Sequence, residues 1–237
     1  MSTSRKIFSI RTLSWLAAFA FSTAVHASPE RVDQLVKTAL DIDPNSKHGA
    51  ALYAAQCKSC HGPLAYGDAA KLIPALAGQR RSYIIKELAD FTELERAATQ
   101  MHVVVARSEV SEPQDWADVA AYLNGLKPLA SPQTGNGKYL SLGEASYQQW
   151  CTSCHEEDGR GDDDGFIPSL RNQHYAYLLQ EMRGLAAMHR TNVDPDLSLF
   201  MDGLANDEME GIADYISRMH GPVKDRAKLR EDGTVGD

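Results

Sequence analysis

The clearest chemical signal in this sequence is a motif of two cysteines and a histidine that occurs twice. The copies are Cys57-Lys58-Ser59-Cys60-His61 and Cys151-Thr152-Ser153-Cys154-His155. Two cysteines three positions apart on a helical turn can each form a thioether with a haem vinyl group, and the adjacent histidine can bind the iron. The motifs therefore predict two covalently attached haem c groups. The expected thioether residues are Cys57, Cys60, Cys151 and Cys154, and the expected iron ligands are His61 and His155.

Both motifs belong to a longer repeat in which equivalent residues lie 94 positions apart. Further pairs with this offset are Gly49 and Gly143, Tyr53 and Tyr147, Ile73-Pro74 and Ile167-Pro168, Gln79 and Gln173, and Glu87 and Glu181. Near the end of each half the offset becomes 93. Chance does not produce this many matches in register, so the chain is predicted to contain two duplicated domains.

Two other uses of paired cysteines fit the sequence less well. A four-cysteine zinc site would need both pairs together, but each pair has the same place in its own repeat and so belongs to a separate core. A disulfide or a thioredoxin-like redox pair suits an oxidising compartment, but it does not explain the histidine in both copies.

Each iron also needs a sixth ligand, and methionine is the first candidate because a thioether favours ferrous iron and raises the potential. Met101 is the one methionine of the first half after the N-terminal apolar segment. Met201 has the corresponding place, in an irregular stretch between Arg190 and the last helix. Four other methionines replace a leucine or tryptophan of the first repeat, which indicates core packing: Met182, Met188, Met209 and Met219.

The assignment of Met201 leaves alternatives open. The stretch between Arg190 and Met201 is longer than that between Arg96 and Met101, so the second ligand loop has been rebuilt. Met188 is a second candidate for this iron. His102 and His189, each of which follows a methionine, are further candidates, although a surface or helix-face position is the simpler interpretation of both.

Three further repeated pairs are expected to surround the haems rather than to react: Pro74 and Pro168, Tyr83 and Tyr177, and Arg96 and Arg190. Each proline could offer a backbone carbonyl to the other ring nitrogen of the axial histidine and so orient the ring. The tyrosines could lie against haem or hydrogen-bond a propionate, and the arginines could pair with one. Helix packing or exposure is the alternative for the tyrosines and arginines.

Helices are predicted to position these residues. Apolar side chains follow the spacing i, i+3, i+4, i+7 over residues 116–123 and again over 209–216, so each half ends in an amphipathic helix. A second pair is expected over 82–95 and 176–189, and a short helix from Gly49 or Gly143 leads into each cysteine motif. No convincing pair of alternating strands occurs. The predicted fold is all-α.

The ends of the chain indicate export. Arg5, Lys6 and Arg11 precede an apolar run over 13–25, and Val25-His26-Ala27 resembles a cleavage site, so residues 1–27 are predicted to be a signal peptide. The run is short for a membrane span, and a retained anchor is the minor alternative. We therefore expect a periplasmic location without a direct membrane span.

The rest of the chain is expected to be divided into two domains at 28–130 and 138–221. A linker is expected at 131–137 and a charged flexible tail at 222–237.

The charge balance narrows the range of partners. Without residues 1–27 the chain has 21 Lys and Arg against 32 Asp and Glu, a net charge of −11. Nucleic acid and acidic lipid are therefore poor partners, whereas a basic face on a redox protein would be attracted.

With these features the mature chain resembles the dihaem cytochrome c family typified by cytochrome c4. The similarity covers residues 46–219 and is carried by the CKSCHG and CTSCHE motifs, the IPALAGQ and IPSLRNQ segments, Arg96 and Arg190, and the VAAYL and IADYI helix ends. It implies two tandem class I cytochrome c domains, each wrapped around one haem with His/Met ligation, in which Met101 and Met201 are the methionines. It also implies single-electron transfer between periplasmic or membrane-bound redox proteins, such as a dehydrogenase donor and a terminal oxidase.

Two functional classes follow from this interpretation. In the first, both irons are six-coordinate and the protein is an electron carrier rather than an enzyme. In the second, it is a peroxidase-like or thiosulfate-oxidising dihaem enzyme with an open or unusually ligated second haem. The sequence favours the carrier, because no cysteine outside the two motifs is available to ligate a catalytic iron.

Overall fold

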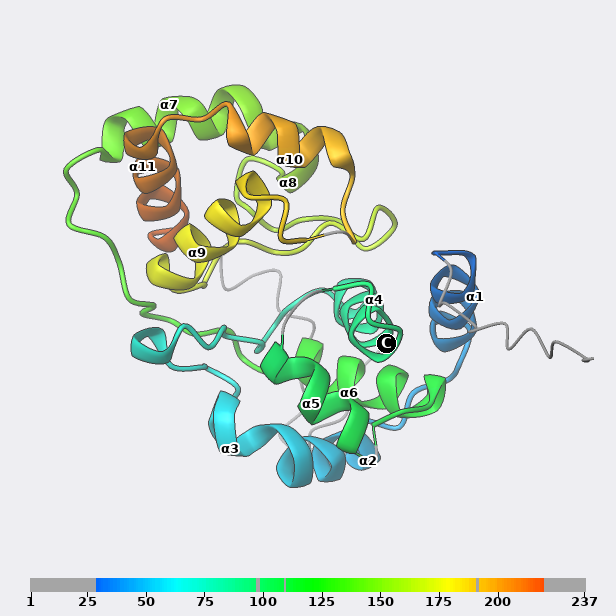
Figure 1. Ribbon diagram of the computed structural model, residues 1–237. Coiled ribbons are helices and arrows are strands. Elements are labelled where there is room, and N and C mark those ends of the chain that lie inside the picture. The colour runs from blue at the N-terminus through cyan, green and yellow to red at the C-terminus, as the bar shows by residue number, and fades with distance from the viewer. Residues whose placement is uncertain (1–28, 97–98, 109, 191, 220–237) are drawn as a thin grey trace, which may run out of the picture.

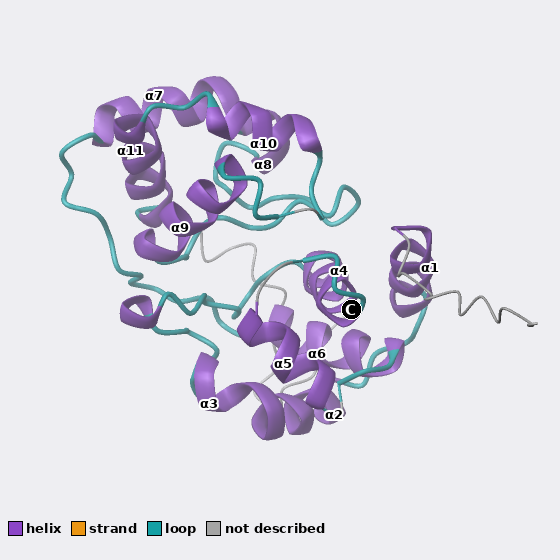
Figure 2. Ribbon diagram, viewed as in Figure 1, coloured by secondary structure: helices purple, strands orange, loops and turns teal. Residues whose placement is uncertain are grey.

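The computed structural model describes residues 29–96, 99–108, 110–190 and 192–219. The predicted signal peptide and the predicted tail lie outside these ranges. The described residues form helices and loops without a strand, apart from two isolated β-bridges, Asp68 with Ile73 and Asp162 with Ile167 (Figure 2). The two bridges are related by the repeat offset. The prediction of an all-α chain is confirmed.

The helices form two groups that are stacked one above the other and joined by an extended segment (Figure 1). The first domain contains α1 (Pro29–Leu40), α2 (Ser46–Leu52), the π-helical turn η1 (Tyr53–Cys57), α3 (Lys58–His61), the 3-10 turn η2 (Ala69–Lys71), α4 (Arg81–Thr92), α5 (Thr99–Arg107) and α6 (Pro113–Gly125). The second contains α7 (Leu140–Trp150), α8 (Thr152–His155), α9 (Tyr175–Ala186), α10 (Pro195–Asp202) and α11 (Asn206–Ser217).

In each domain the helix that leads into the cysteine motif crosses the last helix at a glycine. Helix α2 packs on α6, and α7 packs on α11. A Cβ atom at Gly49 would overlap the backbone of Asp118, and one at Gly143 would overlap the backbone of Gly211. The close approach of the two backbones therefore explains why glycine recurs at this position of the repeat.

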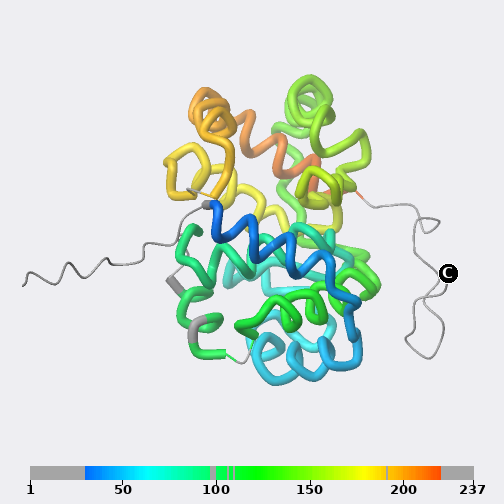
Figure 3. The backbone as a smooth tube through the Cα atoms, turned by 90° about the vertical axis from the view of Figure 1, so that its right-hand side faces the viewer, coloured from blue at the N-terminus to red at the C-terminus, as the bar shows by residue number. Residues whose placement is uncertain are grey.

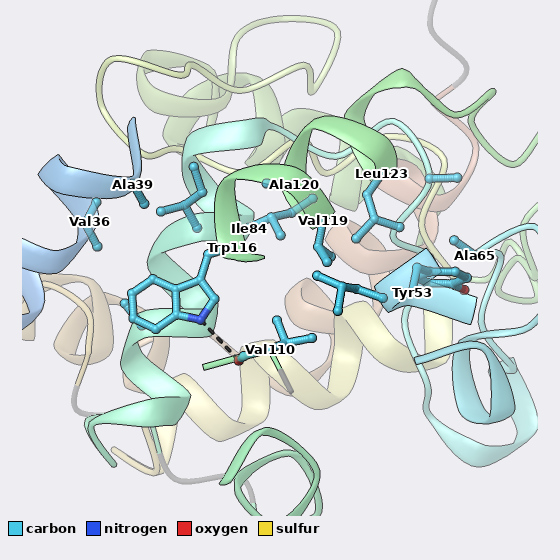
Figure 4. Packing of buried hydrophobic residues seen from close by; sticks show 14 of the residues in the cluster. Val36, Ala39, Tyr53, Ala65, Ile84, Val110, Trp116, Val119, Ala120 and Leu123 are labelled. Carbon is cyan, nitrogen blue, oxygen red and sulfur yellow. Dashed lines mark hydrogen bonds between the residues drawn. The ribbon is translucent and has the colours of Figure 1, made fainter. Parts of the chain in front are cut away.

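The core of the first domain is built around Trp116 and Tyr53, which are almost fully buried (Figure 4). The Trp116 indole donates a hydrogen bond to the Val110 carbonyl at 3.3 Å, which satisfies its one polar atom. Val119, Ala120 and Leu123 complete the predicted apolar stripe, and all are buried. The amphipathic helix predicted over 116–123 is confirmed as α6.

The core of the second domain tests the interpretation of the methionines. Met182 and Met209 are buried in one cluster with Tyr147 and Ile212, and Met219 packs against its edge. The prediction that Met188 is also a core residue is wrong, since it is 56% exposed. Met188 lies just beyond the end of α9, and its φ of 54° turns the chain out of the helical path.

Three helices were missed from the sequence. The stretches around Met101 and Met201 were expected to be irregular, but they form α5 and α10. Asp194 caps α10 by accepting a hydrogen bond from Asp196 N at 2.9 Å, and Pro195 occupies its first turn. Helix α1, which packs on α4 and α6, is absent from the repeat, so comparison of the halves could not reveal it (Figure 3).

The helices predicted over 82–95 and 176–189 are α4 and α9, and both end three residues early. Leu94 and Met188, which the repeat offset relates, both have a positive φ, of 63° and 54°. A left-handed residue after a helix stops the chain from continuing it. The shared stop signal is conformational, because neither position holds glycine.

Alanine at the helix crossing should destabilise the protein. We expect Gly49→Ala and Gly143→Ala each to lower the free energy of unfolding by about 1 to 3 kcal/mol, because the backbones must move apart. Gly184 in α9 is the matched control: its Cβ would meet nothing within 4 Å, so Gly184→Ala should be neutral or stabilising by up to about 1 kcal/mol. Urea unfolding measures all three, and equal effects at the three positions would contradict this explanation.

Candidate functional site

Each cysteine motif lies on a tight helical turn at the surface of its domain. Cys57 closes the π-helical turn η1, and Cys60 follows in α3. In both motifs the first cysteine is half-buried and the second is exposed. Burial, with a smaller contribution from the second cysteine, raises the pKa of Cys57 and of Cys151 to about 11. Before a haem is attached, the first cysteine of each motif is therefore a neutral thiol.

The histidine of each motif is held by a backbone carbonyl. His61 Nδ1 lies 3.1 Å from the Pro74 oxygen, and His155 Nδ1 lies 3.2 Å from the Pro168 oxygen. Burial lowers the pKa of both imidazoles, so they are neutral, and a carbonyl can only accept. Nδ1 therefore carries the proton and Nε2 keeps a free lone pair for a metal. This tautomer fits an iron-bound haem at both sites.

Two repeated features bring the proline carbonyl to the histidine. Gly67 has a φ of 71°, and a Cβ there would overlap the backbone of Ile73 and Pro74. The Gly67 amide also donates to the His61 carbonyl at 2.9 Å. Gly161 repeats these relations in the second domain. The glycine is needed at this position because the proline segment passes directly over it.

Buried tyrosines hold the chain just after each motif. The repeat paired these tyrosines, but the sequence did not show what they do. The Tyr53 hydroxyl donates to the Gly62 carbonyl at 2.6 Å, and Tyr147 donates to the Glu156 carbonyl at 2.8 Å. Burial raises the pKa of both phenols, so both remain protonated donors. Each tyrosine thus links the helix before the motif to the turn after it.

The candidate sixth ligands differ in their surroundings. Met101 is half-buried in α5, and Met201 packs against the core cluster of its domain together with Cys151. Met188 and His189 are exposed, which makes them less suitable than Met201 as the second ligand. His102 is half-buried and its Nδ1 lies 3.0 Å from the Phe91 carbonyl, which leaves Nε2 free as in His61. Met101 and Met201 stay predictions, and His102 stays the alternative in the first domain.

The paired arginines have carboxylate partners at the domain boundary. Arg96 binds Glu87 of its own domain and Glu181 of the other, the latter at 2.8 Å. Arg190 binds Glu181 at 3.1 Å and Glu87 at 2.9 Å. We call these four residues the boundary ring. The expectation that each arginine pairs with a propionate stays a prediction. The boundary ring was not predicted, although the repeat relates Arg96 to Arg190 and Glu87 to Glu181.

The paired tyrosines also lie at this boundary. Tyr83 shares a hydrogen bond with Arg190, and Tyr177 shares one with Arg96. Burial raises the pKa of both phenols, although the arginines oppose the shift. Each tyrosine contacts the arginine of the other domain, so the pair extends the boundary ring. A contact with haem stays a prediction for both.

Two glutamines form a second reciprocal link across the boundary. The Gln79 amide donates to the Ser169 carbonyl at 2.9 Å and accepts from the Ser169 N–H at 2.7 Å. The Gln173 amide makes the same pair of bonds with Ala75, both at 2.9 Å. Ser169 and Ala75 directly follow the two prolines that hold the axial histidines. The boundary therefore ties the histidine-holding segments of the two domains together.

One boundary contact has no counterpart in the other domain. Asp163, in the acidic turn after the second motif, lies 3.3 Å from an Arg80 guanidinium nitrogen and accepts from the Ser82 hydroxyl at 3.0 Å. Arg80 also donates to the Arg160 carbonyl at 2.7 Å, and this second contact does have a counterpart, because His174 Nε2 lies 2.8 Å from the Tyr66 carbonyl. The tertiary structure therefore uses part of this acidic turn to hold the start of α4.

Comparison with known proteins agrees with this geometry. The cytochrome c family model matches residues 46–127 and again 140–220. Cytochrome c4 of Pseudomonas aeruginosa is 32% identical over 70% of this chain and 85% of its own length. The crystal structure of reduced cytochrome c4 from Pseudomonas stutzeri superposes with a TM-score of 0.65 at 27% identity, covering 75% of this chain and all of that one. A thiosulfate dehydrogenase electron acceptor of Stutzerimonas stutzeri is 28% identical over 72% of this chain and 82% of its own.

The chain therefore belongs to the cytochrome c family, as a tandem dihaem protein of the cytochrome c4 kind. Its cofactors are two covalently bound haems c, one for each domain, and it is an electron carrier whose partners are redox proteins. Within the described ranges, no helix combines the length and the apolar character that a membrane crossing needs.

Removal of one arginine from the boundary ring should lower the free energy of unfolding. Arg96→Ala leaves two carboxylates short of a partner, and we expect a loss of about 3 to 5 kcal/mol in the free energy of unfolding. Arg183→Ala is the control, since that arginine is half-exposed and its Glu210 partner is 3.5 Å away, so it should cost at most about 1 kcal/mol. Urea unfolding of the holoprotein compares the two variants. Equal losses for Arg96→Ala and Arg183→Ala would mean that the boundary ring contributes no more to stability than a surface ion pair.

Proposed function

We propose that the protein is a periplasmic relay that passes single electrons between redox proteins through two His/Met-ligated haems. The single observation that carries this proposal is the matched geometry of His61 and His155, whose Nδ1 atoms both face a proline carbonyl. Each haem, when bound, supplies an iron that alternates between the ferric and ferrous states.

The residues of each site have separate tasks in this proposal. Cys57 and Cys60 would hold the first haem through thioethers, with His61 and Met101 on its iron. In the second site, Cys151 and Cys154 would hold the haem, with His155 and Met201 on its iron. The proline carbonyls keep the imidazoles in one orientation and one tautomer, which limits the rearrangement when the charge on the iron changes.

The domain boundary supports a relay rather than two independent carriers. The boundary ring and the two glutamine links join segments that lead directly to both axial histidines. A fixed relation between the two sites is what internal electron exchange requires. Tyr83, Tyr177, Arg96 and Arg190 would complete the surroundings of the haems on this side.

The periplasmic location is proposed from the sequence. Residues 1–27 have the basic start, apolar run and small-residue ending of a signal peptide. We place the domain limits at 28–130 and 138–221, with 131–137 as linker and 222–237 as a charged tail.

A second candidate function is a dihaem redox enzyme or the subunit of one, acting on thiosulfate or peroxide. It is favoured by the similarity to a thiosulfate dehydrogenase electron acceptor. That relative is an electron acceptor of thiosulfate dehydrogenase, so a partner enzyme that oxidises a sulfur compound is an equally suitable donor for a relay. An enzyme would require an open or unusually ligated iron, and the second site is where to look for it.

Removal of Met201 tests the ligation. We expect Met201→Ala to remove about half of the near-infrared iron–methionine absorbance, to lower the potential of one haem and to make that haem high-spin and reactive with carbon monoxide. Met101→Ala should remove the other half. Met188→Ala is the matched control, because this side chain is 56% exposed and should leave the spectrum unchanged. An unaltered spectrum in Met201→Ala would eliminate it as a ligand and leave the enzyme alternative open.

A further inference from the structure

The two cysteine motifs open on surfaces of different chemistry. Cys60 and Cys154 both lie at the surface of their domains, so each motif is next to the outside of the molecule. Because the domains are duplicated, any difference between these surfaces is a departure from a common plan. We propose that the surface around Cys154, centred on Trp150, is the docking site for a lysine-rich redox protein. This inference rests on the proposed relay function.

An aromatic pair of exposed Trp150 and partly buried Phe200 marks the second surface. Trp150 directly precedes Cys151 and is 50% exposed, and its ring centroid lies 6.0 Å from that of Phe200 on α10. Leu199 beside it is 57% exposed. The repeat places Gln56 at the position of Trp150, so the first surface lacks this aromatic anchor. Large exposed aromatic side chains are typical centres of protein interfaces.

Charge separates the two surfaces as well. After His155 the chain carries Glu156 and Glu157, both exposed, where the first domain has Gly62 and Pro63. Glu156 reaches Arg160 at 3.5 Å, but both side chains remain about half-exposed, so the pair is weak. The residues between the cysteines also make the second surface more negative than the first, because exposed Lys58 of the first motif corresponds to a neutral threonine in the second. The second surface is acidic, and the first is not.

The same asymmetry extends over the whole domains. Residues 138–221 contain 15 Asp and Glu against 6 Lys and Arg, whereas residues 28–130 contain 13 against 11. A basic partner is therefore drawn to the second domain by long-range attraction, and contact with Trp150 and Phe200 then fixes its position. A partner without a basic face would dock on the first domain instead. Each domain of the relay would then serve a different redox partner.

The test uses zinc-substituted mitochondrial cytochrome c, a lysine-rich protein, as the probe with the oxidised holoprotein. Light raises the zinc porphyrin to its triplet state, which passes one electron to a ferric haem and becomes a cation radical. Calorimetry in the dark measures binding of the same probe without electron transfer. We expect both the binding and the rate of photoreduction to fall as the ionic strength rises from about 0.01 M to about 0.15 M.

Variants at the two surfaces locate the docking site. Trp150→Gln, which installs the residue of the first domain, should weaken binding and slow photoreduction at least about tenfold. Glu156→Gln with Glu157→Gln should reduce the salt dependence. Leu64→Gln is the matched control at the first surface, where Leu64 is 57% exposed, and it should change neither quantity.

Three outcomes would overturn the assignment. Leu64→Gln could slow transfer more than Trp150→Gln, the two variants could behave alike, or Trp150 could instead support a dimer that sedimentation detects in the wild type and not in Trp150→Gln. Ascorbate reduction separates this test from the proposed function. Equal reduction of both haems in all variants shows an intact relay, whereas haems that ascorbate cannot reduce in the wild type would contradict the relay itself.

Discussion

Four charged side chains, two of them buried and two partly buried, meet where the two domains join, and charge can stay buried only if it is paired. Arg96 and Arg190 each bind one glutamate of their own domain and one of the other. Neither domain alone could satisfy its arginine in this way. The boundary ring therefore requires both domains in one arrangement, and it sets the positions of everything attached to it.

This constraint reaches the candidate haem sites through short covalent paths. Gln79 and Gln173 bind the backbone directly after the prolines, and these prolines hold His61 and His155. The orientation of each imidazole is thus a local property of its own domain, whereas the relation between the two sites is a property of the boundary. An electron relay depends on both, because the irons must be correctly ligated and also close enough to exchange electrons.

The duplication is preserved where two backbones or the two domains meet, and it is lost elsewhere both in the cores and on the surface. The crossing glycines Gly49 and Gly143, the axial histidines and the boundary ring all follow the repeat. Helix α1 and the surface around Trp150 do not. Each crossing glycine is constrained by the backbone that passes over it, and each member of the boundary ring has a partner in the other domain, whereas an exposed side chain is free to diverge. The two ends of the molecule could therefore become different while its centre stayed symmetric.

The sequence alone determined the two cysteine motifs, their histidines, the repeat, the all-α class and the main amphipathic helices, because spacing along the chain is a local property of covalent geometry and helical period. It also paired the prolines and placed their carbonyls against the axial histidines, whereas it paired the tyrosines without showing which atoms they bind. Only the tertiary structure decided that Arg96 and Arg190 bind Glu87 and Glu181, that α1 covers α4, that Met188 is exposed and that Trp150 lies beside Phe200. These contacts join residues far apart in the chain, and their partners are set by how the domains pack, for which the sequence contains no local signal.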